Sequence, residues 1–172
     1  MSYAAFSYGI YGNLSRALKP YFIDIKDDMQ KANISYTLEE YLSMAFFTVT
    51  VTFFIEAVFL SFMLGLFTEP ALAIILAFIL SSGISALLFF IFYTYPATVS
   101  KNRENKIQKV LPFAISYLTT LSSSKVQPIV LFKTIGHFKE YGEVAKEFND
   151  IASNIELFGL TVSAAIKKQA KI

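Results

Sequence analysis

Two long apolar runs dominate the middle of the chain. Met44–Phe67 contains one charged residue, Glu56, and Ala71–Tyr95 contains none. At ~1.5 Å of rise per residue, each run extends about 36 Å as a helix, enough to cross a ~30 Å hydrocarbon core. Only Thr68–Pro70 separates the two runs. The pattern therefore predicts a hairpin of two transmembrane helices.

Within the first run, Thr48–Thr52 alternates threonine and valine, a period of two that is typical of a strand. A single strand in lipid would leave its backbone N–H and C=O groups unpaired, and a closed barrel would need many such segments. The chain has only this one. Threonine hydroxyls in a helix can donate to carbonyls one turn earlier. We therefore interpret this segment as helix.

The segment before the first run carries its apolar residues at spacings of three and four, which predicts an amphipathic helix. These residues are Leu14, Leu18, Phe22, Ile25, Met29 and Ala32. Thr37–Glu40 then has the form of a capping box, in which the side chains of the threonine and of the glutamate three residues later each bind a free backbone N–H. A second helix is expected to begin at about Thr37 and to continue into the first apolar run.

The segment after the second run predicts a small all-α bundle. Its first helix has an apolar face interrupted by Pro112, which should kink that helix or start a new one. Gly159 should cap the next-to-last helix in a left-handed conformation. The bundle has no capping element, so we expect the chain to be part of a longer protein. The expected segments are a helix over Lys101–Ser123, a polar break at Ser122–Lys125, and helices over Pro128–His137, over Gly142–Phe158 and from Thr161 onward.

Composition and charge agree with a membrane protein. Of the 172 residues 55% are hydrophobic and 16% are charged, whereas about a quarter are charged in soluble domains. Lysines and arginines lie before the first run and directly after the second, and none lies between them. The positive-inside rule then places both termini in the cytoplasm of a cell-membrane protein, with the basic flank near anionic headgroups. Three parts are expected: N-terminal amphipathic helices (1–42), the transmembrane hairpin (43–95) and a cytoplasmic helical domain (96–172).

The residue inventory does not favour enzyme chemistry. The chain has no cysteine and one histidine, His137, and it lacks the glycine patterns of phosphate and dinucleotide loops. Glu143, Glu147 and Asp150 share one helical face and could offer oxygens to Ca²⁺ or Mg²⁺. We favour the simpler interpretation of a solvated polar face, and of His137 as a helix-end residue rather than a ligand. We expect no catalytic site, cofactor, metal or nucleic-acid partner.

Glu56 is the exceptional residue of the apolar runs. An ionised side chain at mid-bilayer costs several kcal/mol, so such residues are usually neutral, paired or turned toward protein. Counting from Glu69, Ser82 lies at matched depth within a cluster of small residues: Ser81, Ser82, Gly83 and Ser85. We hypothesise a polar seam in which neutral Glu56 hydrogen-bonds Ser82 or Ser85, or a span of another chain. The alternative is a carboxyl group that is merely packed in the helical bundle.

A series of residues along the second half of the chain forms a familiar pattern. They are Tyr95-Pro96, Arg103, Leu111-Pro112, Tyr141-Gly142-Glu143, Glu147, Ile151, Ile155, Gly159 and Ala165. With this series, residues 95–166 resemble the F domain of type II secretion systems, which also occurs in platform proteins of type IV pili and archaella. The upstream sequence ANISYTLEEYLSMA and its two runs resemble the archaeal branch. The chain departs from the family in having no glycine at Ser122–Lys125 and in ending within what would be the first copy of a domain that usually comes in two.

The resemblance implies a function that the residue pattern alone does not give. Platform proteins of this family are not enzymes; they bind a hexameric secretion ATPase and support the assembly of pilin-like subunits, and we expect the chain to form homo-oligomers. Arg103, Glu143 and Glu147 are then expected to be exposed and to contact the ATPase or another partner. The alternative from another class is a signal-transducing or transport subunit in which Glu56 titrates. Transport would predict further ionisable residues in the apolar runs, and none is present.

Overall fold

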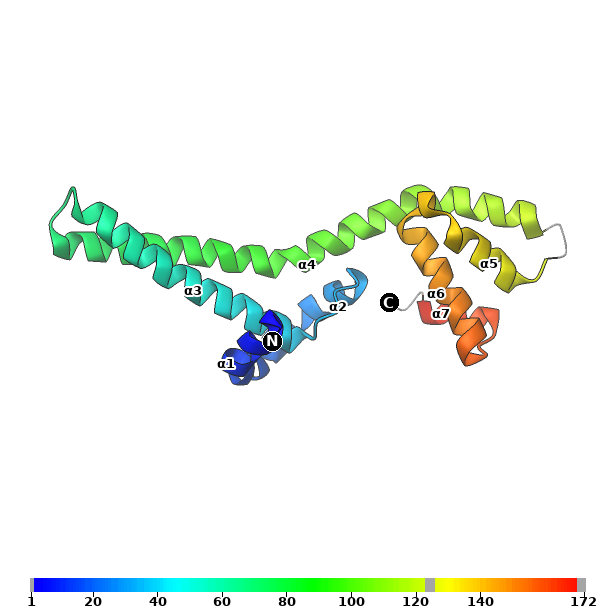
Figure 1. The fold of residues 1–172 in the computed structure, drawn as a ribbon, viewed down its shortest axis with the longest axis horizontal. Helices are drawn as coiled ribbons and strands as arrows, with labels where there is room; N and C mark the ends of the chain where they lie inside the picture. The colour runs from blue at the N-terminus through cyan, green and yellow to red at the C-terminus, as the bar shows by residue number, and fades with distance from the viewer. Residues whose placement is uncertain (1, 123–125, 170–172) are drawn as a thin grey trace. The chain divides into compact units, whose positions relative to one another are not determined.

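The computed structural model describes residues 2–122 and 126–169, and this part of the chain is helical with no strand (Figure 1). The all-α prediction is thereby confirmed. The chain divides into two compact units, with the boundary between Thr98 and Val99. The elements are α1 (Tyr3–Leu18), the 3-10 helix η1 (Lys19–Phe22), α2 (Ile23–Lys31), α3 (Leu38–Gly65), α4 (Pro70–Ser122), α5 (Pro128–His137), the 3-10 helix η2 (Lys139–Tyr141), α6 (Glu143–Phe158) and α7 (Val162–Gln169).

The start of α3 confirms the predicted capping box. Thr37 is the N-cap residue: its hydroxyl accepts from the backbone N–H of Glu40 at 3.2 Å, and the Glu40 carboxylate accepts from the backbone N–H of Thr37 at 2.9 Å. From there α3 continues through the first apolar run without interruption. Both α3 and α4 are long and apolar enough to cross a membrane.

The N-terminal segment differs from the single amphipathic helix that its spacing predicted. Pro20 lies in the first turn of η1, which separates α1 from α2. Proline lacks the backbone N–H that would continue the hydrogen-bond ladder of α1, so the axis can change direction there. The predicted stripe is correct over α2, where Ile25 and Met29 are buried, but Leu14 is exposed on α1.

From the sequence, Pro112 was expected either to kink its helix or to start a new one, and the structure shows no new helix there. α4 is one helix from Pro70 to Ser122 and passes through both Pro96 and Pro112. Each proline removes one backbone hydrogen bond, and the turns on either side keep theirs. The predicted polar break at Ser122–Lys125 lies almost entirely outside the described residues.

In the first unit, α3 and α4 pack through aromatic rings near the N-terminal end of α3 and through small residues nearer the turn. Phe46 stacks on Phe89 with ring centres 5.5 Å apart, and the Tyr41 hydroxyl donates to the Phe92 carbonyl at 2.7 Å. A line of small side chains on α4 is buried at four-residue spacing: Ala73, Ala77, Ser81 and Ser85. Helices approach closely along such a line.

The second unit has a conventional apolar core. Phe132 of α5 stacks on Phe148 of α6 with ring centres 5.7 Å apart, and Ile135 and Val144 are fully buried beside them. The two helices come so close at Gly136 that an added Cβ would lie 2.0 Å from Oδ1 of Asn149, whose amide donates to the Gly136 carbonyl. The predicted bounds of α5 and α6 and the left-handed Gly159 cap, with φ of 62°, are confirmed.

Candidate functional site

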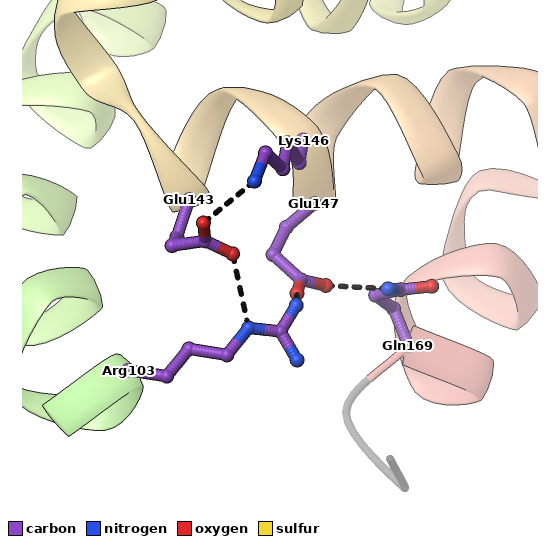
Figure 2. Close-up of polar contacts among 5 residues, drawn as sticks. All are labelled: Arg103, Glu143, Lys146, Glu147 and Gln169. Atoms are coloured by element: carbon purple, nitrogen blue, oxygen red, sulfur yellow. Dashed lines mark hydrogen bonds and ion pairs between the residues drawn. The ribbon is translucent and has the colours of Figure 1, made fainter. Parts of the chain in front are cut away.

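The second unit contains a cluster of charged side chains centred on Arg103. Arg103 lies on α4, and its Nε donates to Glu143 Oε2 of α6 at 3.1 Å. Its Nη2 donates to Glu147 Oε1, one turn further along α6. Figure 2 shows the guanidinium group lying between the two carboxylates. The four-residue separation of Glu143 and Glu147 puts both on one face of α6, so a single arginine can bind both.

Two further residues complete the cluster (Figure 2). Lys146 Nζ donates to the second oxygen of Glu143 at 2.7 Å, and Gln169 Nε2 of α7 donates to the second oxygen of Glu147. The carboxylate of Glu147 therefore accepts from both α4 and α7. The cluster joins α4, α6 and α7 within this unit.

Burial makes this cluster more than a surface ion pair. The side chain of Arg103 is 14% exposed, while that of Lys146 is 66% exposed. The Lys146 ammonium group is the main cause that holds the pKa of Glu143 below its ordinary value; burial acts in the opposite direction and Arg103 adds to the lowering. Exposed ion pairs contribute little to stability. Removing one partner of a half-buried ion pair costs more, because the remaining charge loses its hydrogen bonds while it stays partly shielded from water.

The sequence prediction that Arg103, Glu143 and Glu147 are exposed is wrong. All three are half-buried, because each faces the others rather than solvent. Contact with an ATPase remains a prediction.

The Ca²⁺ or Mg²⁺ site that Glu143, Glu147 and Asp150 could have formed is occupied by a side chain. The Arg103 guanidinium lies between the two glutamate carboxylates, and Asp150 is exposed. Within the described residues no group of three or more acidic, histidine or cysteine side chains is placed to hold a metal ion.

The single histidine has a local hydrogen bond only. His137 is exposed, and its Nδ1 lies 2.6 Å from the Lys133 carbonyl oxygen one turn earlier. A carbonyl can only accept, so Nδ1 carries the proton. This geometry agrees with a helix-end residue.

The second candidate site, in the apolar helices, differs from the predicted seam at Ser82. Ser82 is exposed, whereas Ser81 and Ser85 are buried on the face of α4 that is turned inward. The hydrogen bond from Glu56 to Ser85 is not formed: Glu56 Oε2, Ser85 Oγ and Ser81 Oγ are each buried without a hydrogen-bond partner. These are buried polar atoms of the kind that require an explanation.

The register of the hairpin explains why Glu56 does not reach Ser82 or Ser85. Phe53 contacts Phe78 with ring centres 5.5 Å apart, and a Cβ on Gly65 would lie 3.9 Å from Ala73. Glu56, between Phe53 and Gly65, therefore faces the part of α4 before Ser81. The prediction counted from Glu69, whereas α3 ends at Gly65 and α4 begins at Pro70, so the middle of the turn lies before Glu69.

Three members of the two sites were not proposed from the sequence, and a local signal was available for two of them. Lys146 lies three residues after Glu143, a spacing that brings side chains together on a helix. Ser81 was named in the small-residue cluster but not as a partner of Glu56, although it continues the four-residue repeat of Ala73 and Ala77, which marks one helical face. Gln169 had no local signal, because only the packing of α7 on α6 brings it to Glu147.

Comparison with known proteins gives a partial match. The chain is 23% identical over 78 residues to an uncharacterized protein of Methanocaldococcus jannaschii, a match that covers 45% of this chain and 13% of that protein. The chain thus spans about an eighth of the length of this relative. No family model matches the chain, and no solved structure matches it.

Proposed function

We propose that this chain is a multi-pass cell-membrane protein, with both ends in the cytoplasm, that serves as a platform component of a type II secretion, type IV pilus or archaellum machine. The observation that supports the membrane part is the distribution of side chains in α3 and α4. Large apolar residues such as Phe54, Phe62 and Ile75 are exposed, and small ones such as Ala77 and Ser81 are buried. This is the arrangement expected of helices that face lipid.

The proposed work of the second unit is binding. Arg103, Glu143 and Glu147 contribute indirectly, by holding α6 in place. Arg103 links α4 to α6 through its ion pairs with the two glutamates, and this fixes which surface α6 presents to a partner. Lys146, on the exposed rim of the same cluster, is the member that a partner can reach. The partner we propose is the hexameric secretion ATPase, with pilin-like subunits engaged by the assembled platform; this identification rests on the resemblance of residues 95–166 to the F domain.

The test is capture of the ATPase by the full chain reconstituted in nanodiscs. The probe is the secretion ATPase encoded nearest to the gene of this chain. We expect Arg103→Glu to abolish capture, because it places three carboxylates together. Adding Glu147→Arg should restore much of it if the cluster acts by positioning. Lys133→Ala is the matched control, since it removes an exposed ion pair to Glu156 in the same unit.

Two results would count against this proposal. If the unmodified chain captures no ATPase, the platform role is wrong. If Arg103→Glu captures as well as the unmodified chain while Lys146→Glu does not, the positioning role of the cluster is wrong and the rim alone binds.

A second candidate function is supported by one observation, the unpartnered Glu56. A buried carboxyl oxygen without a hydrogen bond in an apolar helix is a feature of proton-coupled transport and signalling proteins. In this alternative the chain is a signal-transducing or transport subunit that uses the hairpin at Glu56. Proton flux in vesicles that contain the chain, abolished by Glu56→Gln, would favour it over the platform; flux equal to that of empty vesicles would exclude the transport form.

A further inference from the structure

Helix α1 differs in chemistry from the rest of the N-terminal region. From Ser2 to Ser15 the sequence has no charged residue, whereas Arg16 begins a stretch in which acidic and basic residues are frequent. The stretch before Arg16 also holds three tyrosines, a residue that gathers at membrane–water interfaces. With 16 residues, α1 is about 24 Å long, too short to cross a ~30 Å hydrocarbon core.

The contacts of α1 place it along the N-terminal part of α3 (Figure 1). Lys19, just beyond its C-terminal end, pairs with Glu39 at 2.7 Å, and Ser15 lies 2.8 Å from Ser43. At its N-terminal end, Tyr3 lies 2.6 Å from the Thr48 hydroxyl. The helix therefore lies antiparallel to α3 and inclined to it. Its C-terminal end lies at the charged start of α3, and its N-terminal end lies beside the apolar run that begins at Met44.

This placement sets a depth for α1. If α3 spans a membrane with its hydrocarbon-facing part beginning at Met44, Thr48 lies about 6 Å inside and Thr50, which accepts from Tyr11 at 2.9 Å, about 9 Å inside. Helices that lie in a membrane interface are buried about 5–10 Å into it. The Lys19–Glu39 pair lies outside the apolar run, at headgroup level.

The polar groups on the inner face of α1 are all provided with partners, as a site outside water requires. Thr48 donates to the Met44 carbonyl, so Tyr3 must be the donor to Thr48. Ser43 likewise donates to the Glu39 carbonyl, so Ser15 donates to Ser43. Ser7 donates to the Tyr3 carbonyl at 2.7 Å.

The outer face of α1 is exposed and mostly apolar, with Asn13 as a polar side chain near its C-terminal end. Its exposed large residues follow one line along the helix: Tyr3, Phe6, Ile10 and Leu14. Phe47 of α3 joins this line to the exposed surface of the hairpin, with its ring edge-on to both Tyr3 and Phe6 at centre distances of 5.8 and 5.4 Å. The apolar surface of α1 is thus continuous with that of α3.

From this depth, hydrogen bonding and continuity we infer that α1 is a membrane-interface helix, which lies in the cytoplasmic leaflet with Phe6, Ile10 and Leu14 in contact with lipid chains. The inference rests on the proposed membrane insertion of α3 and α4, and it adds a third membrane-embedded element that the hydropathy of the chain does not indicate. α2, with its acidic and basic residues, remains on the water side of the break at Pro20.

The test uses the absence of native cysteine. Single variants Ile10→Cys, Asp27→Cys and Phe90→Cys of the full chain are labelled with a nitroxide in phosphatidylglycerol-containing liposomes. Collisions with oxygen, which dissolves in lipid, and with a water-soluble nickel chelate are then measured. We expect nickel-chelate accessibility at Ile10→Cys to be at least about tenfold lower than at Asp27→Cys, because polar solutes partition poorly into hydrocarbon, with high oxygen accessibility at Ile10→Cys and at Phe90→Cys.

Each other outcome overturns the inference in a distinct way. Nickel accessibility at Ile10→Cys equal to that at Asp27→Cys, with Phe90→Cys still in lipid, would place α1 in water and leave the proposed hairpin intact. Protection of Ile10→Cys from both reagents would show that protein covers α1, most simply a second copy of the chain. Nickel access at Phe90→Cys would remove the membrane hairpin itself, and with it the proposed function.

Discussion

The apolar part of the hairpin and the second unit bury opposite kinds of side chain. In the second unit the core consists of large apolar residues such as Phe132, Ile135 and Phe148. In the hairpin the buried residues of α4 are small, such as Ala77 and Ser81, while residues of the same size as those in the core of the second unit are exposed. Water drives large apolar groups inward, whereas in lipid no such force acts and close helix approach decides what is inside. The difference is the one expected if the apolar part of the hairpin lies in lipid and the second unit in water, as proposed above.

Their polar groups follow the same division. The second unit holds charges inside as a cluster in which Arg103, Glu143 and Glu147 satisfy one another. The first unit uses hydroxyl groups instead, such as Ser15 with Ser43 and Tyr11 with Thr50. A hydroxyl needs one or two short hydrogen bonds and carries no net charge, so its burial costs far less than that of an ion. The exceptions in the first unit are Glu56 and the Lys19–Glu39 pair at the start of α3.

The largest expected effect is on stability, in a comparison of the same isoleucine-to-alanine substitution in each of the two units. Ile135→Ala should destabilise the second unit by about 2–5 kcal/mol, because it leaves a cavity in a closed core. Ile75→Ala, at a side chain that is 56% exposed in contrast to 0% for Ile135, should cost much less. Hydrogen exchange of the reconstituted chain, analysed separately for each unit, measures both. Equal losses would contradict the division between the units.

Removal of the arginine tests the charge cluster. Arg103→Ala should destabilise the second unit by about 2–4 kcal/mol, since Glu143 and Glu147 lose a shared donor and repel each other while half-buried. The measurement is protection of α6 from proteolysis and from hydrogen exchange. Lys133→Ala serves as the control, because the Lys133–Glu156 pair is exposed and should contribute less than about 1 kcal/mol. A cost for Arg103→Ala no greater than for the control would mean that the cluster is dispensable.

Adjacent serines on α4 test which face is inside the hairpin. Ser81→Leu should lower stability by about 1–3 kcal/mol, because no space exists between closely packed helices for a larger side chain. Ser82→Leu should have almost no effect, since Ser82 is exposed. Thermal unfolding of the two variants in the same detergent gives the comparison. The reverse order would restore the seam that was predicted from the sequence.

The smallest expected effect is a pH dependence confined to the second unit. The pKa of Glu143 is lowered from its ordinary value of 4.5, chiefly by Lys146. A carboxyl with a lowered pKa in the folded state contributes stability above its ordinary value, and that contribution is lost as the pH falls through the lower folded value. The second unit should therefore weaken as the pH falls below about 4.5.

Two substitutions separate this titration from general acid unfolding. Glu143→Gln should remove the contribution of this residue at all pH values, and Lys146→Ala should reduce it. Melting curves of the second unit over the acid range, recorded at low and high salt, give the measurement. An acid dependence that is identical in all three proteins would exclude Glu143 as its source.

Local features were predicted well where short-range physics decides them. The capping box at Thr37 and Glu40, the start of α5 at Pro128 and the left-handed Gly159 each depend on a few neighbouring residues. The break between α1 and α2 at Pro20 was missed, because the three- and four-residue spacing continues across it. The long apolar helices were also predictable, since their length and composition depend on no contact.

What the sequence by itself determined is the helical class, the start of α3, the bounds of α5 and α6, the short turn of the hairpin and the separation of an apolar half from a polar half. Each follows from backbone hydrogen bonding, capping and the periodicity of apolar residues, which act over a few turns. The tertiary structure alone decided that Ser81 rather than Ser82 is buried, that Arg103 binds Glu143 and Glu147 across 40 and 44 residues, and that α1 lies along α3. These depend on the register and rotation of one helix against another, and a shift of one residue turns a helical face by about 100°.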